Sequence, residues 1–266
     1  MKFSLTNEFK DRLREEILNY NIDFIQKSFE GVSYVDITEL LYEFDSNDSK
    51  YILDNIDFDI SAKIISELDE DNRKNFLKIF SAQEVAKFLN VIDSDDGADI
   101  LSELDFEFRG DVISQIEDSE KSKNLKELLR YDEDVAGGLM AIELVKCNIN
   151  WKINQCIDLI KKQAENVSNI YSVYVTDNKG KLLGKVSLKD ILLAKDNSRI
   201  KDVYDDYIIS VDAKMNQEEV SQIMQKYDLT VLPVVNKRGK LLGRITIDDV
   251  VDVIAETAEE ERQIMS

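Results

Sequence analysis

The feature that most constrains the fold is a twelve-residue repeat, which runs without a gap from Ser33 to Ile116. Its seven units are SYVDITELLYEF, DSNDSKYILDNI, DFDISAKIISEL, DEDNRKNFLKIF, SAQEVAKFLNVI, DSDDGADILSEL and DFEFRGDVISQI. The first position is always Ser or Asp, whose side chain can accept a hydrogen bond from the free amides of a helix start. Positions eight, nine and twelve are apolar in every unit, which forms one stripe at helical spacing. Each unit is therefore predicted to be a short amphipathic helix.

Helices of about ten residues are only marginally stable alone in water. The units must therefore stack side by side, each burying the apolar stripe that its neighbour leaves open, and the repeat predicts a compact α-solenoid. We expect this acidic α-helical repeat domain over residues 33–131, preceded by an N-terminal helical segment over residues 1–32.

The formal net charge is −20, and it is distributed unevenly. Residues 1–136 hold 34 acids and 16 bases, a net −18, whereas residues 137–266 hold 20 acids and 18 bases, a net −2. This asymmetry indicates two domains with different functions. It also argues against nucleic acid as a main ligand, because binding to a phosphate backbone depends on Lys and Arg.

The residue types argue against several other classes of function. The chain has no histidine, which makes zinc sites and histidine-dependent catalysis improbable. Cys147 and Cys156 have neither metal-ligand nor redox spacing. We expect both cysteines and Trp151 to be buried core residues. No segment is long and apolar enough to span a membrane. The sequence therefore does not predict an enzyme.

An acidic stretch within the repeat is the candidate functional feature. Between Lys87 and Arg109 there is no basic residue. The acidic residues of this stretch are Asp93, Asp95, Asp96, Asp99, Glu103, Asp105 and Glu107. One interpretation is a solvated face, with Asp93 and Asp95 serving the helix cap and dipole. The other is a site for a small divalent cation, which relieves the repulsion between closely spaced carboxylates. Asp95 and Asp99 are four residues apart and share a helix face.

A second, different repeat occupies the C-terminal half. Residues 174–191, YVTDNKGKLLGKVSLKDI, align without gaps to residues 233–250, PVVNKRGKLLGRITIDDV. In each copy a β-prone run leads through a glycine turn to a second β-prone run and then to a helix. Ser187 and Thr246 are the expected caps of that helix. The helices expected before the hairpins cover Ile153–Ala164 and Gln217–Tyr227. The predicted order is strand, helix, strand, strand, helix, twice.

These residues carry a resemblance to known families. The G-x-x-[S/T]-x-x-D motif at Gly184, Ser187 and Asp190 recurs at Gly243, Thr246 and Asp249, and the pair resembles two CBS modules in tandem. The larger arrangement adds the acidic helical repeat, the connecting DEDVAGGLM of residues 132–140 and the IDDVVDV of residues 247–253. Together they resemble the cytosolic part of the MgtE family of magnesium transporters over roughly residues 30–262. We expect a connector or hinge over 132–140, CBS module 1 over 141–203, CBS module 2 over 204–254, and the start of a helix leading to a membrane domain over 255–266.

The resemblance implies magnesium ions between the acidic solenoid and the second module. The matching ligands are Asp95 and Asp99 in the solenoid with Asp249 and Asp252 in the module, together with the carbonyl of Gly137. The resemblance also implies a metal ligand at Asp228, for which Asp59 is the weaker choice of partner. It further implies an acidic cluster of Glu256, Glu260 and Glu261. In CBS modules generally, the Ser/Thr and Asp of the motif hold an adenine nucleotide. ATP is thereby implied at Ser187 and Asp190 or at Thr246 and Asp249, for which helix capping is the structural alternative.

The resemblance implies a magnesium-gated mechanism. Magnesium bridges shared carboxylates, the domains close about the glycines of Val135–Gly138, and the last helix, expected from Asp248 to Met265, transmits closure to the pore. We expect a homodimer through the CBS modules, a transmembrane domain of the same transporter as partner, and a place at the cytoplasmic face of the membrane. Because this last helix has no glycine stop and no following element, we expect the chain to be the soluble portion of a longer transporter. The alternative is an adenine-nucleotide-sensing CBS scaffold without magnesium gating.

Overall fold

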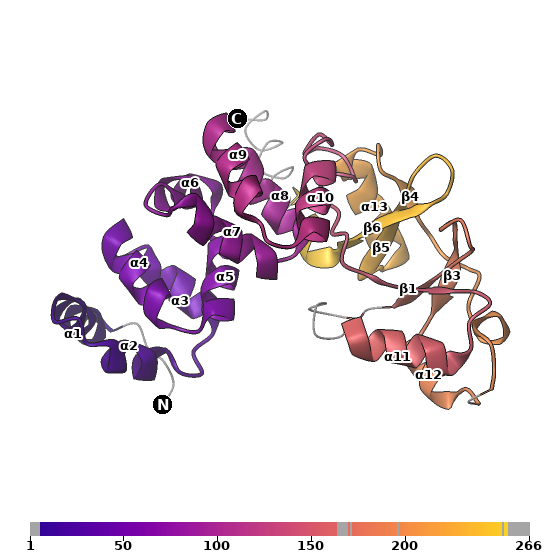
Figure 1. Ribbon diagram of the computed structural model, residues 1–266, viewed down its shortest axis with the longest axis horizontal. Coiled ribbons are helices and arrows are strands. Elements are labelled where there is room, and N and C mark those ends of the chain that lie inside the picture. Colours follow the sequence, from indigo (N-terminus) through magenta and orange to yellow (C-terminus); the bar gives the residue numbers. More distant parts are fainter. Residues whose placement is uncertain (1–5, 164–169, 171, 196, 252, 255–266) are drawn as a thin grey trace. The chain divides into compact units, whose positions relative to one another are not determined.

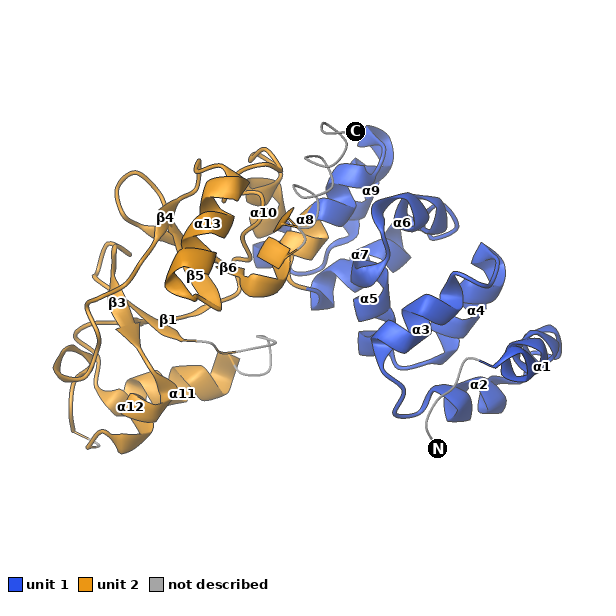
Figure 2. Cartoon of the chain, turned by 180° about the vertical axis from the view of Figure 1, so that it is seen from behind, with its two compact units in different colours: residues 1–92, 99–122 blue, residues 93–98, 123–266 orange. Residues whose placement is uncertain are grey.

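A computed structural model describes residues 6–163, 170, 172–195, 197–251 and 253–254. The chain divides into two compact units, coloured separately in Figure 2. Unit 1 comprises residues 1–92 and 99–122, and unit 2 comprises residues 93–98 and 123–266. The first turn of the sixth repeat helix therefore belongs to the second unit, together with the tandem modules.

The N-terminal half is helical throughout its described length, as the repeat predicts (Figure 1). Its helices are α1 (Asn7–Leu18), α2 (Ile22–Phe29), α3 (Tyr34–Leu41), α4 (Ser46–Asn55), α5 (Phe58–Glu67), α6 (Glu70–Leu77), α7 (Ala82–Val91), α8 (Ser94–Glu103), α9 (Phe106–Gln115) and α10 (Ser119–Leu128). Each of the seven repeat units contributes one helix, α3 to α9. The α-solenoid of short repeats is confirmed.

The helices of unit 1 stack with a period of two repeats. Helix α3 packs on α5, α5 on α7, and α7 on α9. The apolar stripes supply the contacts, and residues such as Leu40, Ile64 and Leu89 are fully buried. Across the α5–α7 contact the ring of Phe58 stacks on that of Phe88, with centroids 5.3 Å apart. Each of these repeat helices therefore packs mainly on the helix two repeats further along the chain.

The first residue of each repeat unit lies at the start of its helix. Asp45 and Asp57 accept hydrogen bonds from two first-turn amides each, while Asp69 and Ser81 each accept one. Ser33 and Asp105 occupy the N-cap position without a side-chain cap bond. Only two or four residues separate consecutive repeat helices, so each cap residue lies close to the end of the preceding helix, which keeps the repeat short.

Two ion pairs fix distant helices of unit 1. The guanidinium of Arg73 in α6 binds both carboxylate oxygens of Glu103, one at 2.9 Å, and donates to the carbonyl of Ser66 at 2.7 Å. Lys50 in α4 binds Glu84 in α7 at 2.5 Å. Glu103, one of the acids in the stretch without bases, is thus explained by packing, because a buried carboxylate requires a partner.

Unit 2 contains the two modules in the predicted element order. The first has β1 (Val145–Asn148), α11 (Ile153–Gln163), β2 (Val173–Thr176), β3 (Leu182–Val186) and α12 (Leu188–Leu193). The short 3-10 helix η1 (Ile200–Asp202) connects it to the second, which has β4 (Val211–Asp212), α13 (Gln217–Tyr227), β5 (Val231–Val235) and β6 (Leu241–Thr246). A further helix begins at residue 247. Both predicted hairpin-preceding helices form, and Ala164 lies outside the described residues.

The duplication extends to the register of the sheets. In both three-stranded sheets the first strand pairs parallel with the second, and the second pairs antiparallel with the third. Val173 pairs with Val186, and Leu232 pairs with Ile245 at the equivalent positions. The hairpin tips are joined reciprocally, since Leu182 donates to the carbonyl of Gly239 at 2.9 Å and Leu241 donates to that of Gly180 at 3.0 Å. Both glycines have positive φ, which favours glycine at these tips.

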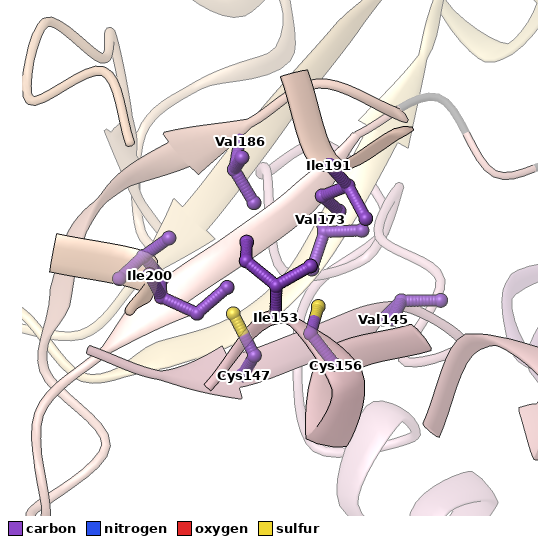
Figure 3. Packing of buried hydrophobic residues seen from close by; sticks show 9 residues of the cluster. Val145, Cys147, Ile153, Cys156, Val173, Val186, Ile191 and Ile200 are labelled. Atoms are coloured by element: carbon purple, nitrogen blue, oxygen red, sulfur yellow. The ribbon is translucent and has the colours of Figure 1, made fainter. Parts of the chain in front are cut away.

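The first module has its own apolar core, drawn in Figure 3. Cys147 from β1 and Cys156 from α11 lie in it, and their sulfur atoms point in among the aliphatic side chains of Ile153 and its neighbours. Both are free thiols, and Trp151 packs partly buried against the same cluster. The expectation that these three residues belong to a core is confirmed.

Glu84 provides a test of the packing of unit 1. Burial raises its pKa, but the hydrogen bonds and charge of Lys50 and the bonds to Ser81 outweigh burial and lower that pKa to about 2. A carboxyl whose pKa is lowered by folding stabilises the folded state above its unfolded pKa, and this contribution disappears as the pH falls through the folded value. We expect Glu84→Gln to lower the melting temperature near neutral pH, and the difference from the parent chain to vanish near pH 2. The exposed Glu39→Gln serves as control, and an equal effect of the two changes on the pH profile would contradict the assignment.

Candidate functional site

The candidate site is a pair of carboxylates within unit 2. Asp95 lies in the first turn of α8, in the segment 93–98 that belongs to this unit, and Asp249 lies in the helix that follows β6. Both side chains are partly buried. Burial raises the pKa of Asp95 well above its usual value, and the negative charges of Asp96, Asp249 and Asp93 raise that pKa further. Asp95 and Asp249 therefore repel each other when both are ionised.

Asp249 is held in place by the start of its own helix. One of its oxygens accepts hydrogen bonds from the backbone N–H of Thr246 at 2.9 Å and from the Thr246 hydroxyl at 2.8 Å. Burial raises the pKa of Asp249 to about 6 against the lowering effect of these bonds, and the neighbouring charge of Asp248 adds to the rise. Asp249 thus accepts from the backbone amide at the start of its helix, as helix capping expects, and the other carboxylate oxygen of Asp249 lies outside the Thr246 contact.

A buried network surrounds this pair. Arg244, in β6, binds the carboxylate of Asp93 at 3.3 Å and donates from Nε to the carbonyl of Glu143 at 2.8 Å. Ser94 is fully buried, and both its amide, at 3.1 Å, and its hydroxyl, at 2.6 Å, donate to Oε2 of Glu143. The same hydroxyl accepts from the amide of Ile142 at 2.8 Å. Asp93 is thus fastened to Arg244 of the second module, and Ser94 to Glu143 at the start of the first.

Sequence reasoning did not identify Ser94, Glu143 or Arg244 as partners of the acidic stretch. Ser94 occupies the second position of its repeat unit, which follows no apolar period. Arg244 is equivalent to Lys185 of the first module. From the sequence, both are typical of ordinary strand residues. The only available signal was that Arg244 is a base within a buried β-strand, a position at which a charge needs a partner.

The two carboxylates fit a small divalent cation in their chemistry. Magnesium is held in proteins by one or two carboxylates and keeps several waters, so Asp95 and Asp249 are a sufficient protein contribution. Within the described residues there is no group of three or more Asp, Glu, Cys or His side chains placed to hold a metal ion.

The other implied ligands are placed as follows. Asp99 is exposed on α8, four residues after Asp95, and Asp59 is exposed in the first turn of α5; both belong to unit 1. Asp228 is exposed in unit 2, where it ends α13 in the left-handed conformation at φ 51°. Asp252, Glu256, Glu260 and Glu261 lie outside the described residues.

The connector is fastened to the second module. Ala136 donates to the carbonyl of Met215 at 2.7 Å, and Gly137 donates to that of Ala213 at 2.8 Å. A Cβ at Gly137 would lie 2.3 Å from the ring of Tyr131, and one at Gly138 would lie 2.5 Å from the carbonyl of Asp132. Close packing thus accounts for both glycines. Their role in a hinge, like the ligand role of the Gly137 carbonyl, stays a prediction.

The first module carries the equivalent motif pair in an exposed setting. Ser187 Oγ donates to Asp190 Oδ2 at 2.6 Å and accepts from the Asp190 amide at 3.0 Å. Both residues are exposed, whereas Thr246 is buried. Helix capping is sufficient to explain why Ser187 contacts Asp190 and why Thr246 contacts Asp249. Of these two pairs, the one in the first module is accessible to solvent.

Comparison with known families agrees with this architecture. Residues 32–134 match the MgtE intracellular N domain, and residues 134–197 and 200–256 match the CBS domain. The chain is an MgtE N domain followed by a CBS pair. It is homologous to the MgtE magnesium transporters. The magnesium transporter MgtE of Thermus thermophilus is 37% identical over 144 residues, which are 54% of this chain and 32% of that protein. That of Enterococcus faecalis is 36% identical over 140 residues, 53% of this chain and 31% of that protein.

Solved structures extend the MgtE likeness over nearly the whole chain. The crystal structure of the cytosolic domain of the Mg²⁺ channel MgtE in complex with ATP has a TM-score of 0.85 at 28% identity, over 92% of this chain and 99% of that one. The crystal structure of the soluble part of a magnesium transporter has a TM-score of 0.83 at 28% identity, over 94% of this chain and 98% of that one.

Two further findings concern enzymes and membranes. Inosine-5′-monophosphate dehydrogenase of Aquifex aeolicus is 27% identical over 133 residues, which are 26% of the enzyme, and this likeness runs through the CBS domains alone. The MgtE homologues are transporters. Among the residues the structure describes, no helix is both long and apolar enough to cross a membrane.

Gly137 offers a test of the connector packing. The added methyl of Gly137→Ala would collide with the Tyr131 ring, so we expect the free energy of unfolding to fall by about 1–3 kcal/mol. Gly110→Ala is the matched control, because a Cβ there meets nothing within 4 Å and the residue lies within α9. That change should stabilise the chain by roughly 0.5–1 kcal/mol. Chemical denaturation measures both, and a Gly137→Ala chain as stable as the parent would contradict the packing account.

Proposed function

We propose that this chain is the cytosolic magnesium-sensing regulatory part of a magnesium transporter. The observation that carries the proposal is the pair of Asp95 and Asp249, two partly buried carboxylates of unit 2, where the charge of Asp249 raises the pKa of Asp95. Magnesium bridging these carboxylates draws the acidic helical domain onto the second CBS module. Asp99, Asp252 and the Gly137 carbonyl are the further ligands we propose for this region, with Asp228, Asp59, Glu256, Glu260 and Glu261 at additional acidic positions.

The energetics suit a sensor of a millimolar ion. Two unit charges 4 Å apart repel by roughly 4 kcal/mol at the effective dielectric constant found near protein surfaces. Binding with a millimolar dissociation constant supplies about 4 kcal/mol. The two quantities are of the same size, so the balance between the separated and bridged states changes over the concentration range of a weakly bound ion. Several such sites acting on one equilibrium make the response steeper.

The second module also carries the helix that we propose transmits the magnesium response to the transporter. Asp249 lies in the helix that begins at residue 247, directly after β6. We propose that this helix leads to the transmembrane domain of the same transporter, at the cytoplasmic face of the membrane, and that bridging at Asp249 closes the pore by restraining it. Low intracellular magnesium then reopens uptake.

A homodimer through the CBS modules is part of the same proposal. Leu192 and Leu193, adjacent residues of α12, are 79% and 74% exposed. Large apolar side chains exposed in a group favour a protein partner. A second copy of the chain is the partner that would place the two regulatory parts of a dimeric transporter side by side.

The test of magnesium bridging uses Asp95→Asn together with Asp249→Asn. Asparagine preserves shape and removes the charge, so we expect the fold to persist and the magnesium response to disappear. In the parent chain, magnesium should slow cleavage after the exposed Glu133 by a glutamate-specific protease, because bridging restrains the connector. In the double variant the cleavage rate should be the same with and without magnesium.

The matched control for this test is Asp190→Asn, the equivalent residue of the first module. It should retain the full magnesium effect on cleavage. A double variant that still responds to magnesium as the parent chain does would show that Asp95 and Asp249 are not the bridge.

Adenine-nucleotide sensing is the second candidate function. It is favoured by the similar MgtE cytosolic structure that holds ATP and by the exposed Ser187–Asp190 pair of the first module. ATP would supply a ribose for which this pair offers a hydroxyl and a carboxylate. Thr246 and Asp249 are a weaker place for it, since the threonine hydroxyl is buried and donates to Asp249.

Calorimetric titration with ATP distinguishes the two functions. We expect Asp190→Ala to weaken ATP binding by about tenfold, the size of one lost hydrogen bond to a charged group, while magnesium still slows cleavage after Glu133. Tight ATP binding to a parent chain that does not respond to magnesium would favour the nucleotide-sensing scaffold instead. Equal ATP affinity of the parent and variant chains would exclude Asp190 from nucleotide binding.

A further inference from the structure

Residues 93–98 are joined to Arg244 of the second module and to Glu143 of the first by contacts that involve neither Asp95 nor Asp249. The contacts are those of Asp93, Ser94, Glu143 and Arg244, which we call the latch. The latch contains one ion pair and three hydrogen bonds, and Ile142 adds a fourth hydrogen bond by donating to the Ser94 hydroxyl at 2.8 Å. None of these interactions needs a cation.

The latch is built as a buried network. Ser94 has no exposed surface, and the side chain of Arg244 is 6% exposed. Ser94 uses both its amide and its hydroxyl on a single carboxylate oxygen of Glu143, and Arg244 fixes the backbone of Glu143 through the carbonyl. Hydrogen bonds that involve charged groups out of water are about twice as strong as neutral ones. The arrangement therefore favours attachment of residues 93–98 to Glu143 and Arg244 at any magnesium concentration.

The carboxylate pair opposes the latch. Asp95 follows Ser94 directly in the chain, so attachment through Ser94 brings Asp95 toward Asp249. The attraction at residues 93 and 94 and the repulsion at residue 95 therefore act on the same six-residue segment. A cation at the pair need not hold the segment in place, because removing the repulsion is enough.

We propose that Asp93, Ser94, Glu143 and Arg244 form a magnesium-independent latch, and that magnesium acts by cancelling the carboxylate repulsion that opposes it. This rests on the proposed magnesium-sensing function and makes it more specific. These four residues are positioning residues that set the magnesium concentration at which the segment attaches. Neutralising the carboxylates must then have the same effect as adding magnesium.

The test measures hydrogen exchange of residues 93–98 and 139–145 by mass spectrometry in the full chain. Magnesium should increase the protection of both segments in the parent chain. Asp95→Asn with Asp249→Asn should show that same protection without magnesium. Adding Ser94→Ala to this pair should remove the protection with or without magnesium. In the parent background, Ser94→Ala should raise the magnesium midpoint by up to about tenfold, the fold-change expected for a lost bond to a charged group.

A second latch variant guards against a purely local effect of Ser94→Ala. Arg244→Lys keeps the charge but loses the Nε bond to Glu143, and it should also raise the midpoint. Lys185→Gln, at the equivalent position of the first module, should leave the midpoint unchanged.

Two outcomes separate the failure of the latch from the failure of magnesium sensing. If the Asp95→Asn and Asp249→Asn chain stays unprotected at every magnesium concentration, the cation is an obligatory ligand bridge, and the latch is overturned while magnesium sensing stands. If the parent chain responds equally to magnesium and to potassium at matched ionic strength, magnesium sensing fails. The latch is then judged by whether Ser94→Ala and Arg244→Lys lower protection in the same buffer, and unchanged protection would overturn it.

Discussion

The repulsion between Asp95 and Asp249 is the interaction on which the chemistry of the second unit depends. Both carboxylates lie where burial raises the pKa, and the charge of Asp249 raises the pKa of Asp95 further. Such a pair opposes folding unless something compensates for it. The charge of Arg244 lowers the pKa of Asp249, and the same guanidinium binds Asp93 and the carbonyl of Glu143. The chain has 54 acids and 34 bases, and we propose an external cation as the further source of positive charge.

The acids of the stretch from Asp93 to Glu107 do not share one role. Glu103 is the buried partner of Arg73, Asp105 occupies a helix N-cap, and Asp93 binds Arg244. A run of like charges in a sequence can thus combine helix capping, packing and a candidate site. The distinction depends on which residues of other elements each carboxylate meets, and that information is absent from the run itself.

The sequence predicted the elements well and the contacts poorly, for physical reasons. The Ser/Asp caps and the apolar stripe are local signals, so each repeat helix could be placed from Ser33 onward. The duplication at an offset of 59 likewise predicted the two sheets, down to equivalent pairs such as Val173 with Val186 and Leu232 with Ile245. The network of Ser94, Glu143 and Arg244 joins residues up to 151 positions apart and follows no period. The glycines of the connector were interpreted as a hinge, whereas their packing depends on Tyr131 and Asp132, which only the folded chain brings close.

The central claim is that a divalent cation, beyond general screening, brings the acidic helical domain and the second CBS module together. Its most direct test is the radius of gyration by small-angle X-ray scattering, from zero to about 20 mM MgCl₂ and in KCl of matched ionic strength, since salt alone also weakens acidic repulsion. We expect compaction in magnesium that potassium does not reproduce. The same radius of gyration in the two salts at every ionic strength would contradict it.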